Sequence, residues 1–150
     1  MTEKNRSISA LENGTVIDHI NSNNTLKVVN ILKLNDEDKM IMIGVNFKSK
    51  TMGKKGIIKI ANKELSMDEL NKISLVAPNA SIAIIKDFEI VKKSKLDFPK
   101  EFIGIAKCGN SNCITNHEPV KTHFKTISEE PVMVKCKYCE KVFDNNIEII

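Results

Sequence analysis

The four cysteines of this 150-residue chain carry its clearest chemistry, and all of them lie in the last third. Cys108 and Cys113 form a C-x4-C pair, and Cys136 and Cys139 form a C-x2-C pair after a gap of 22 residues. Two close thiolate pairs give a tetrahedral metal ion four soft ligands, so the spacing predicts one structural Zn²⁺ ion per chain. Two disulfides are the alternative, which the C-x2-C spacing and the expected cytoplasmic setting disfavour. Four thiolates leave no open coordination position, so a catalytic zinc is not expected.

Other catalytic patterns are scarce. The chain contains no P-loop, no nucleophile elbow and no H-E-x-x-H sequence, so an independent enzyme is not expected. His117 and His123 lie between the cysteine pairs and are expected at the surface or beside the metal rather than among its ligands. Asp18 and His19 form a carboxylate–imidazole neighbour pair, which either is a polar strand end or recognises a polar ligand.

Two lysines are candidates for an anion site. Lys59 stands between Ile58 and Ile60 in a predicted strand, so it should project onto the face opposite them. Such a lysine is usually the solvent side of a strand. Together with Lys93 it can instead hold an anionic ligand, as point charges for phosphate.

Composition and charge set the broad class. The chain is 41% hydrophobic and 28% charged, which is typical of a globular protein with one domain or two small ones. No apolar run is long enough to cross a bilayer, and the first residues, MTEKNRSIS, lack an apolar signal core, so we expect a cytoplasmic protein. Residues 101–150 carry six lysines and seven acidic residues, a net charge of −1, whereas the first hundred residues carry +5. This charge argues against the alternative of a zinc-ribbon nucleic-acid-binding protein.

Periodicity predicts the elements that must position these residues. The best-marked helix runs from about Met67 to Val76, because Ser66 and Glu69 form a capping box and Pro78 follows. Another helix is predicted at 24–34, with Asn and Ser residues at 21–24 as candidates for its N-cap. Extended segments are predicted at 8–11, 15–20, 40–47, 56–60, 81–85 and 88–91.

The order β-α-β-β-α-β with an extra strand predicts an α+β fold. It matches a ferredoxin-like N-terminal domain, in which two helices cover one face of an antiparallel sheet. The charged stretch 92–100 is expected to be a linker. Segments 101–108, 131–139 and 145–150 are expected to be short strands of a small all-β zinc-binding C-terminal domain.

Five segments carry a resemblance to a known family: GTVIDHI at 14–20, MGKKGIIKI at 52–60, LVAPNASI at 75–82, CGNSNCITNHEPV at 108–120 and KCKYCEKVF at 135–143. Over essentially its whole length the chain resembles the regulatory chain of aspartate carbamoyltransferase. The resemblance implies a non-catalytic subunit in pyrimidine biosynthesis that forms regulatory dimers. It implies a nucleotide-binding allosteric domain at 1–96 for CTP, ATP and UTP, and a zinc-binding domain at 101–150 that docks on the catalytic chain.

The resemblance also assigns residues. The nucleotide site would consist of Ala10, Leu11, Asp18, His19, Lys59, Phe88, Ile90 and Lys93. The interface with the catalytic chain would include Asn110, Asn112, Glu140 and Lys141. Ser9, Ala83 and Phe88 depart from the familiar residues at their positions, and these departures concern recognition of the base rather than of the phosphates.

Overall fold

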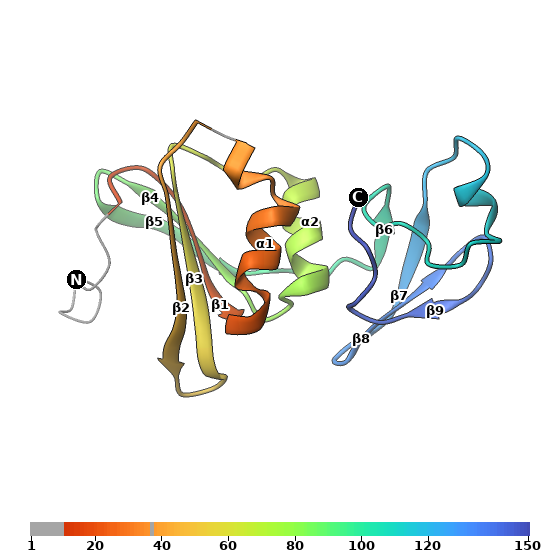
Figure 1. Cartoon of the computed structure of the whole chain (residues 1–150). Coiled ribbons are helices and arrows are strands. Elements are labelled where there is room, and N and C mark those ends of the chain that lie inside the picture. The colour runs from red at the N-terminus through yellow and green to blue at the C-terminus, as the bar shows by residue number, and fades with distance from the viewer. Residues whose placement is uncertain (1–10, 37) are drawn as a thin grey trace.

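The computed structural model describes residues 11–36 and 38–150, and two antiparallel sheets dominate it. Ala10 and the segment 8–10, to which a site residue and a strand were assigned above, lie outside the described residues. Figure 1 shows the first sheet with its two helices in the N-terminal part and the second sheet in the C-terminal part. No helix among the described residues is long and apolar enough to span a membrane.

The first sheet has five strands in the order β2-β3-β1-β4-β5. The strands are β1 (Gly14–Asn21), β2 (Ile41–Ser49), β3 (Gly53–Ala61), β4 (Ser81–Lys86) and β5 (Glu89–Lys95). Helices α1 (Thr25–Ile31) and α2 (Met67–Val76) follow β1 and β3 and cover one face of this sheet (Figure 1). The predicted ferredoxin-like arrangement with an extra strand is therefore confirmed, with β5 at one edge.

Helix α2 begins where its capping residues predict. The Ser66 hydroxyl accepts a hydrogen bond from the Glu69 amide at 3.2 Å, and the Glu69 carboxylate accepts one from the Ser66 amide at 3.0 Å. Helix α1 lacks such a side-chain cap. Its N-cap residue, Asn24, instead donates its side-chain amide to the Val76 carbonyl at 3.2 Å, so this asparagine ties the two helices together.

The core between helices and sheet is aliphatic. Ile17, Ile58 and Ile82 are cross-strand partners on β1, β3 and β4, and they pack with Val28 and Ile73 of the helices. Because side chains alternate along a strand, this row fixes which face of the sheet is buried. We call the opposite face, away from the helices, the open face.

Two predicted boundaries are wrong. Strand β5 continues to Lys95, so Lys92–Lys95 belong to the sheet and the linker is shorter than 92–100. Lysines suit this position because β5 is an edge strand exposed along its whole length. Phe88 does not open β5; it lies with Asp87 in the preceding two-residue turn, where both residues have positive φ.

The second sheet has the order β6-β7-β8-β9. Its strands are β6 (Glu101–Ile103), β7 (His123–Glu129), β8 (Val132–Cys136) and β9 (Val142–Phe143). The strand at 123–129 was not predicted, and the segment 145–150 forms only an isolated bridge between Ile149 and Ala106. The small all-β character of this part is confirmed.

The two parts of the molecule share apolar residues. Leu75 of α2 is 1% exposed and packs in the cluster of the C-terminal part, with Phe102 and Ile105. Ile149, near the C-terminus, packs against both clusters. The C-terminal part is therefore seated directly on the end of α2.

Candidate functional site

The four cysteine sulfurs form a compact cluster in the C-terminal part. All of them lie within 4.8 Å of one another, and the Sγ–Sγ distances are 3.6 Å for Cys108–Cys139 and 3.8 Å for Cys113–Cys136. With metal–sulfur bonds of about 2.3 Å, ligands of a tetrahedral zinc ion lie about 3.8 Å apart. The cluster therefore has the size and the donor set of a metal site, in keeping with the predicted pairing of the two motifs.

Polar groups around the cluster hold its two loops. Thr115 donates its hydroxyl to the Cys113 sulfur at 3.2 Å. The Asn116 side chain donates to the carbonyls of Cys108 and Asn110, at 3.0 and 2.8 Å, and so closes the first loop. In the second loop the Cys136 carbonyl accepts from the Glu140 amide at 2.8 Å, with Glu140 at positive φ. The bonds to the Cys108, Asn110 and Cys136 carbonyls hold the backbone of the two loops, and the bond from Thr115 orients the Cys113 sulfur.

The thiols differ in acidity. Burial raises the pKa of the Cys108 thiol to about 12. Burial also raises the pKa of Cys139, but hydrogen bonds from the Lys141 amide and the Asn110 side chain outweigh it and lower the pKa to about 6. Burial also acts to raise the pKa of Cys113, but hydrogen bonds from Thr115 lower it, so the thiolate form is favoured at both Cys113 and Cys139. A bound cation favours the thiolate form of all four cysteines.

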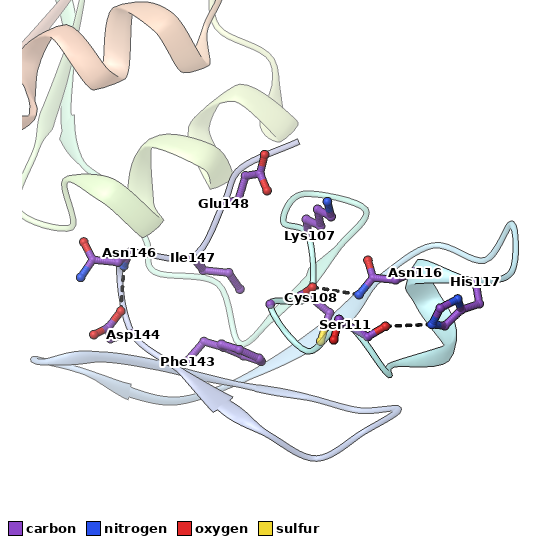
Figure 2. Close-up of a pocket in the computed structure, with 11 residues that line it drawn as sticks. Lys107, Cys108, Ser111, Asn116, His117, Phe143, Asp144, Asn146, Ile147 and Glu148 are labelled. Atoms are coloured by element: carbon purple, nitrogen blue, oxygen red, sulfur yellow. Dashed lines mark hydrogen bonds between the residues drawn. The ribbon is translucent and has the colours of Figure 1, made fainter.

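A cavity of about 650 Å³ lies beside the first cysteine loop, and Figure 2 shows Cys108 and His117 among its lining residues. The His117 ring lies 2.8 Å from the Ser111 carbonyl, and Asp144 accepts the Asn146 amide at 2.9 Å. Neither His117 nor His123 belongs to the sulfur cluster. The His117 ring thus contacts the backbone carbonyl of Ser111, and among the described residues it forms no hydrogen bond with the Ser111 hydroxyl or the Cys108 sulfur.

The residues assigned to an interface lie around the two cysteine loops. Asn110 accepts the Asn112 amide at 3.1 Å, so its side chain also forms a loop turn. Asn112, Glu140 and Lys141 are exposed and have no side-chain hydrogen bond with the rest of the described chain. They are therefore accessible for contact with another molecule.

The open face of the five-stranded sheet carries the second candidate site. Cross-strand partners form one row, from Lys59 on β3 through Val16 on β1 and Ala83 on β4 to Lys93 on β5. Partners in a row project to the same face, and this row alternates with the buried isoleucines. The two lysines are thus separated by three strand spacings, about 14 Å at about 4.8 Å each.

A β-bulge places two polar residues together beside this row. Ile17 and Ile20 are both fully buried although they are three residues apart, because the register shifts by one residue between them. Asp18 and His19 occupy the bulge, and His19 has a φ of 59°. The His19 Nδ1 lies 3.0 Å from the Ser81 hydroxyl, and Asp18 accepts from Lys55 at 3.1 Å.

A second bulge acts at the edge of the sheet. Ile85 pairs with Ile90 and Ala83 pairs with Lys93, so β5 contains one more residue than β4 between these pairs. Ile90 and Lys93 therefore share the open face despite their odd spacing. Ile90 is 59% exposed and Phe88 is 62% exposed, which leaves an uncovered apolar surface at this end.

Leu11 completes the apolar end. It is buried in a small cluster with Ala83 and Ile85, and the adjacent Glu12 carbonyl accepts the Phe88 amide at 2.9 Å. The site thus has an apolar end with Leu11, Phe88 and Ile90. Its polar end carries Asp18, His19 and Lys59. Burial lowers the pKa of Lys59, against the opposing effect of the Asp18 charge, as expected for a lysine held partly out of water.

The sequence interpretation missed two members of this group. Lys55 forms a salt bridge with both Asp18 oxygens, and Ser81 contacts His19. Their roles depend on the strand register, which pairs Asp18 with Ser81 and Asn21 with Lys55. No local sequence signal marks them.

Comparisons with known proteins agree along the chain. The model of the family described as "Aspartate carbamoyltransferase regulatory chain, allosteric domain" matches residues 6–97. The model described as "Aspartate carbamoyltransferase regulatory chain, metal binding domain" matches residues 100–149. The chain is 48% identical to an aspartate carbamoyltransferase regulatory chain of Thermococcus sibiricus over 97% of both chains. It is 50% identical to that of Phocaeicola vulgatus, over 89% of this chain and 86% of the relative.

Proposed function

Since the chain belongs to the family of aspartate carbamoyltransferase regulatory chains, we propose that it binds CTP and ATP on the open face of its first sheet and thereby controls a catalytic chain. UTP is a further candidate effector. In this proposal residues 1–96 form the allosteric domain, and residues 101–150 form the zinc domain that docks on the catalytic chain. The subunit performs no reaction of its own and acts in the cytoplasm, in pyrimidine biosynthesis.

The observation that carries the proposal is the row from Lys59 to Lys93. Two cations about 14 Å apart at the ends of one row, with Asp18 and His19 beside that row on β1, can contact separate parts of a long ligand that has phosphates at one end and a ribose in the middle. Ile90 and Phe88 offer apolar surface on which a base can stack. We expect Leu11, together with Ala10, to meet the base through backbone groups.

We infer that the metal is zinc. Four sulfur donors at the spacing of a tetrahedral site suit Zn²⁺ better than cations that prefer oxygen ligands. Bound zinc would supply charge that keeps all four thiols deprotonated and would join the two cysteine loops. Its role is structural, because the cysteines fill the coordination sphere.

The proposed partners are the catalytic chain and a second copy of this chain. Asn110, Asn112, Glu140 and Lys141 are proposed to contact the catalytic chain, consistent with their position around the loops. Strand β2 is an edge of the first sheet and exposes Ile43 and Val45, which supports pairing with a second copy.

Two measurements test the proposal. Calorimetry with CTP and ATP on the purified chain should show saturable binding of each, with one displacing the other. Co-purification with the catalytic chain, followed by an assay with each nucleotide, should show activity that depends on the effector. Absence of nucleotide binding by a metal-loaded chain that assembles normally would contradict the proposed effector site.

A further inference from the structure

Glu12 and Asn13, just before β1, hold the turn that carries Phe88. The Asn13 side-chain oxygen accepts a hydrogen bond from the Asp87 amide at 3.2 Å, and the Glu12 carbonyl accepts one from the Phe88 amide at 2.9 Å. Both amides of the two-residue turn between β4 and β5 are therefore bound by one short segment. One acceptor belongs to the backbone, and the other is the Asn13 side chain.

The turn needs such support because of its backbone conformation. Asp87 and Phe88 have φ values of 51° and 65°, the left-handed region that both residues of a type I′ hairpin turn occupy. Aspartate enters this region with a short polar side chain, but the second position is usually glycine, and a bulky residue there is strained. Both residues are exposed, so packing contributes little to holding them. The two hydrogen bonds from residues 12 and 13 therefore help to keep a phenyl ring at a position that favours glycine.

Asn13 is itself held in place. Its backbone carbonyl accepts a hydrogen bond from the Asn62 amide at 3.0 Å, and the next residue, Gly14, pairs with Ile85 of β4. Gly14 has a φ of 149°, and a Cβ at this position would collide with the Ile60 carbonyl. The absence of a side chain at Gly14 thus lets the start of β1 lie close to β3, and it brings Asn13 beside the turn.

The position of the Phe88 ring matters for the proposed ligand. Phe88 and Ile90 belong to the apolar end of the open face, where the base of a nucleotide is proposed to stack, whereas the phosphates are proposed to bind at the cationic end. Stacking depends on the orientation of an aromatic ring. A ring that is already fixed in its binding position also loses less conformational entropy when the ligand binds.

We propose that Asn13 is a positioning residue of the effector site, which fixes the turn at Asp87 and thereby holds the Phe88 ring for the nucleobase. Asn13 acts through Phe88 and raises the affinity for the part of the ligand that carries the base. This inference rests on the proposed function, because the ligand is the nucleotide proposed there.

A first measurement tests the positioning of the ring without any nucleotide. The chain contains no tryptophan, so Phe88→Trp introduces a single fluorophore at the turn. Adding Asn13→Ala should lower the fluorescence anisotropy of that tryptophan, because the turn loses one of its two anchors. Adding Asn13→Asp should leave the anisotropy unchanged, because aspartate keeps an acceptor oxygen at the same place. Unchanged anisotropy with Asn13→Ala would overturn the inference whether or not the chain binds nucleotides.

Calorimetry on the full, metal-loaded chain then tests the role of Asn13 in binding. Asn13→Ala should weaken CTP and ATP binding by about 2- to 10-fold, the range for one lost hydrogen bond, and should leave the affinity for inorganic triphosphate unchanged. This loss should disappear when Phe88→Ala is already present, since the two residues act as one unit. Glu12→Ala is the matched control and should bind like the parent, because the Glu12 side chain forms no hydrogen bond among the described residues and its carbonyl remains.

Separate outcomes distinguish the possible failures. If Asn13→Ala weakens inorganic triphosphate as much as CTP and ATP, Asn13 only stabilises the domain and the inference fails. The same holds if Asn13→Ala weakens both nucleotides equally with and without Phe88→Ala. In either case nucleotide binding by the parent leaves the proposed function intact. If the parent binds neither CTP nor ATP, the proposed function fails and this inference fails with it.

Discussion

Replacing Lys93 by alanine tests the proposed nucleotide site most directly. Lys93 is fixed by its pairing with Ala83 at the edge of the row that begins at Lys59. A hydrogen bond to a charged group contributes about 1.5–3 kcal/mol, so the loss should weaken CTP and ATP binding by about 10- to 150-fold. Lys93 is exposed on its edge strand, which places its effect near the lower limit. Lys59→Ala should have the larger effect, because Lys59 is partly buried.

The assay is calorimetric titration of the isolated chain with each nucleotide. Both affinities should fall together, because CTP and ATP share the ribose and the triphosphate. Lys92→Ala is the matched control: Lys92 neighbours Lys93 but pairs with Ile84, on the other face of the sheet. The zinc content of the variant should not change, and neither should the activity of the catalytic chain assembled with it in the absence of effector, since allostery couples distinct sites. If Lys93→Ala bound both nucleotides as tightly as the parent, the open face would not be the effector site.

Four further predictions follow from other parts of the molecule. Cys113→Ala should unfold the C-terminal part and abolish docking on the catalytic chain while nucleotide binding persists, because structural zinc supplies roughly 10–16 kcal/mol of apparent binding free energy in small metal-folded peptides. Metal analysis measures the zinc content and circular dichroism measures the loss of structure. A variant that still binds zinc stoichiometrically would contradict the assignment of the four cysteines as zinc ligands. Asn112→Ala should loosen assembly with the catalytic chain at unchanged zinc content, as judged by sedimentation at limiting concentration. Ala83→Asn adds an amide to the small apolar cluster of Leu11, Ala83 and Ile85. It should change the ratio of the CTP affinity to the ATP affinity more than it changes the affinity for the triphosphate that both nucleotides share. Titration with inorganic triphosphate measures the second quantity. The Glu69 pKa is lowered, since the Ser66 amide and a neighbouring lysine together outweigh the effect of burial. Because the folded-state pKa is the lower one, the ionised Glu69 stabilises the fold above pH 4.5, and this stabilisation is lost as the pH falls through the lowered pKa. Glu69→Gln should therefore reduce the free energy of unfolding by about 0.3–1 kcal/mol at neutral pH and by less in acid. Denaturant titrations at neutral and at acidic pH measure the difference.

Local signals predicted the elements whose cause is local. Helix α2 begins at Met67 because Ser66 and Glu69 form a capping box, and these two residues are only three positions apart in the sequence. The grouping of the cysteines followed from their spacing, and the sulfurs of Cys108 and Cys139 lie together as the metal interpretation requires. The order of elements sufficed for the sheet topology, because few arrangements satisfy β-α-β-β-α-β.

Features that depend on pairing between distant strands were not predictable. Strand β7 buries mainly Phe124 and has little apolar periodicity of its own, so it is a strand because β6 and β8 flank it. The salt bridge of Lys55 with Asp18 depends on the register of β1 and β3. Aromatic residues favour strands, but Phe88 lies with Asp87 in the two-residue turn between β4 and β5.

Two of the three bulges of the first sheet, those in β1 and β5, bear on how the chain can change its length in evolution. Between Ile17 and Ile20, and between Ile90 and Lys93, one extra residue keeps apolar and polar side chains on their proper faces. Deleting one residue in either interval would exchange the two faces for the rest of that strand and would send core side chains to the open face. Insertions and deletions among related chains should therefore be absent from these two intervals. They should be tolerated at the hairpin tip around Lys50, between the end of β2 and the start of β3.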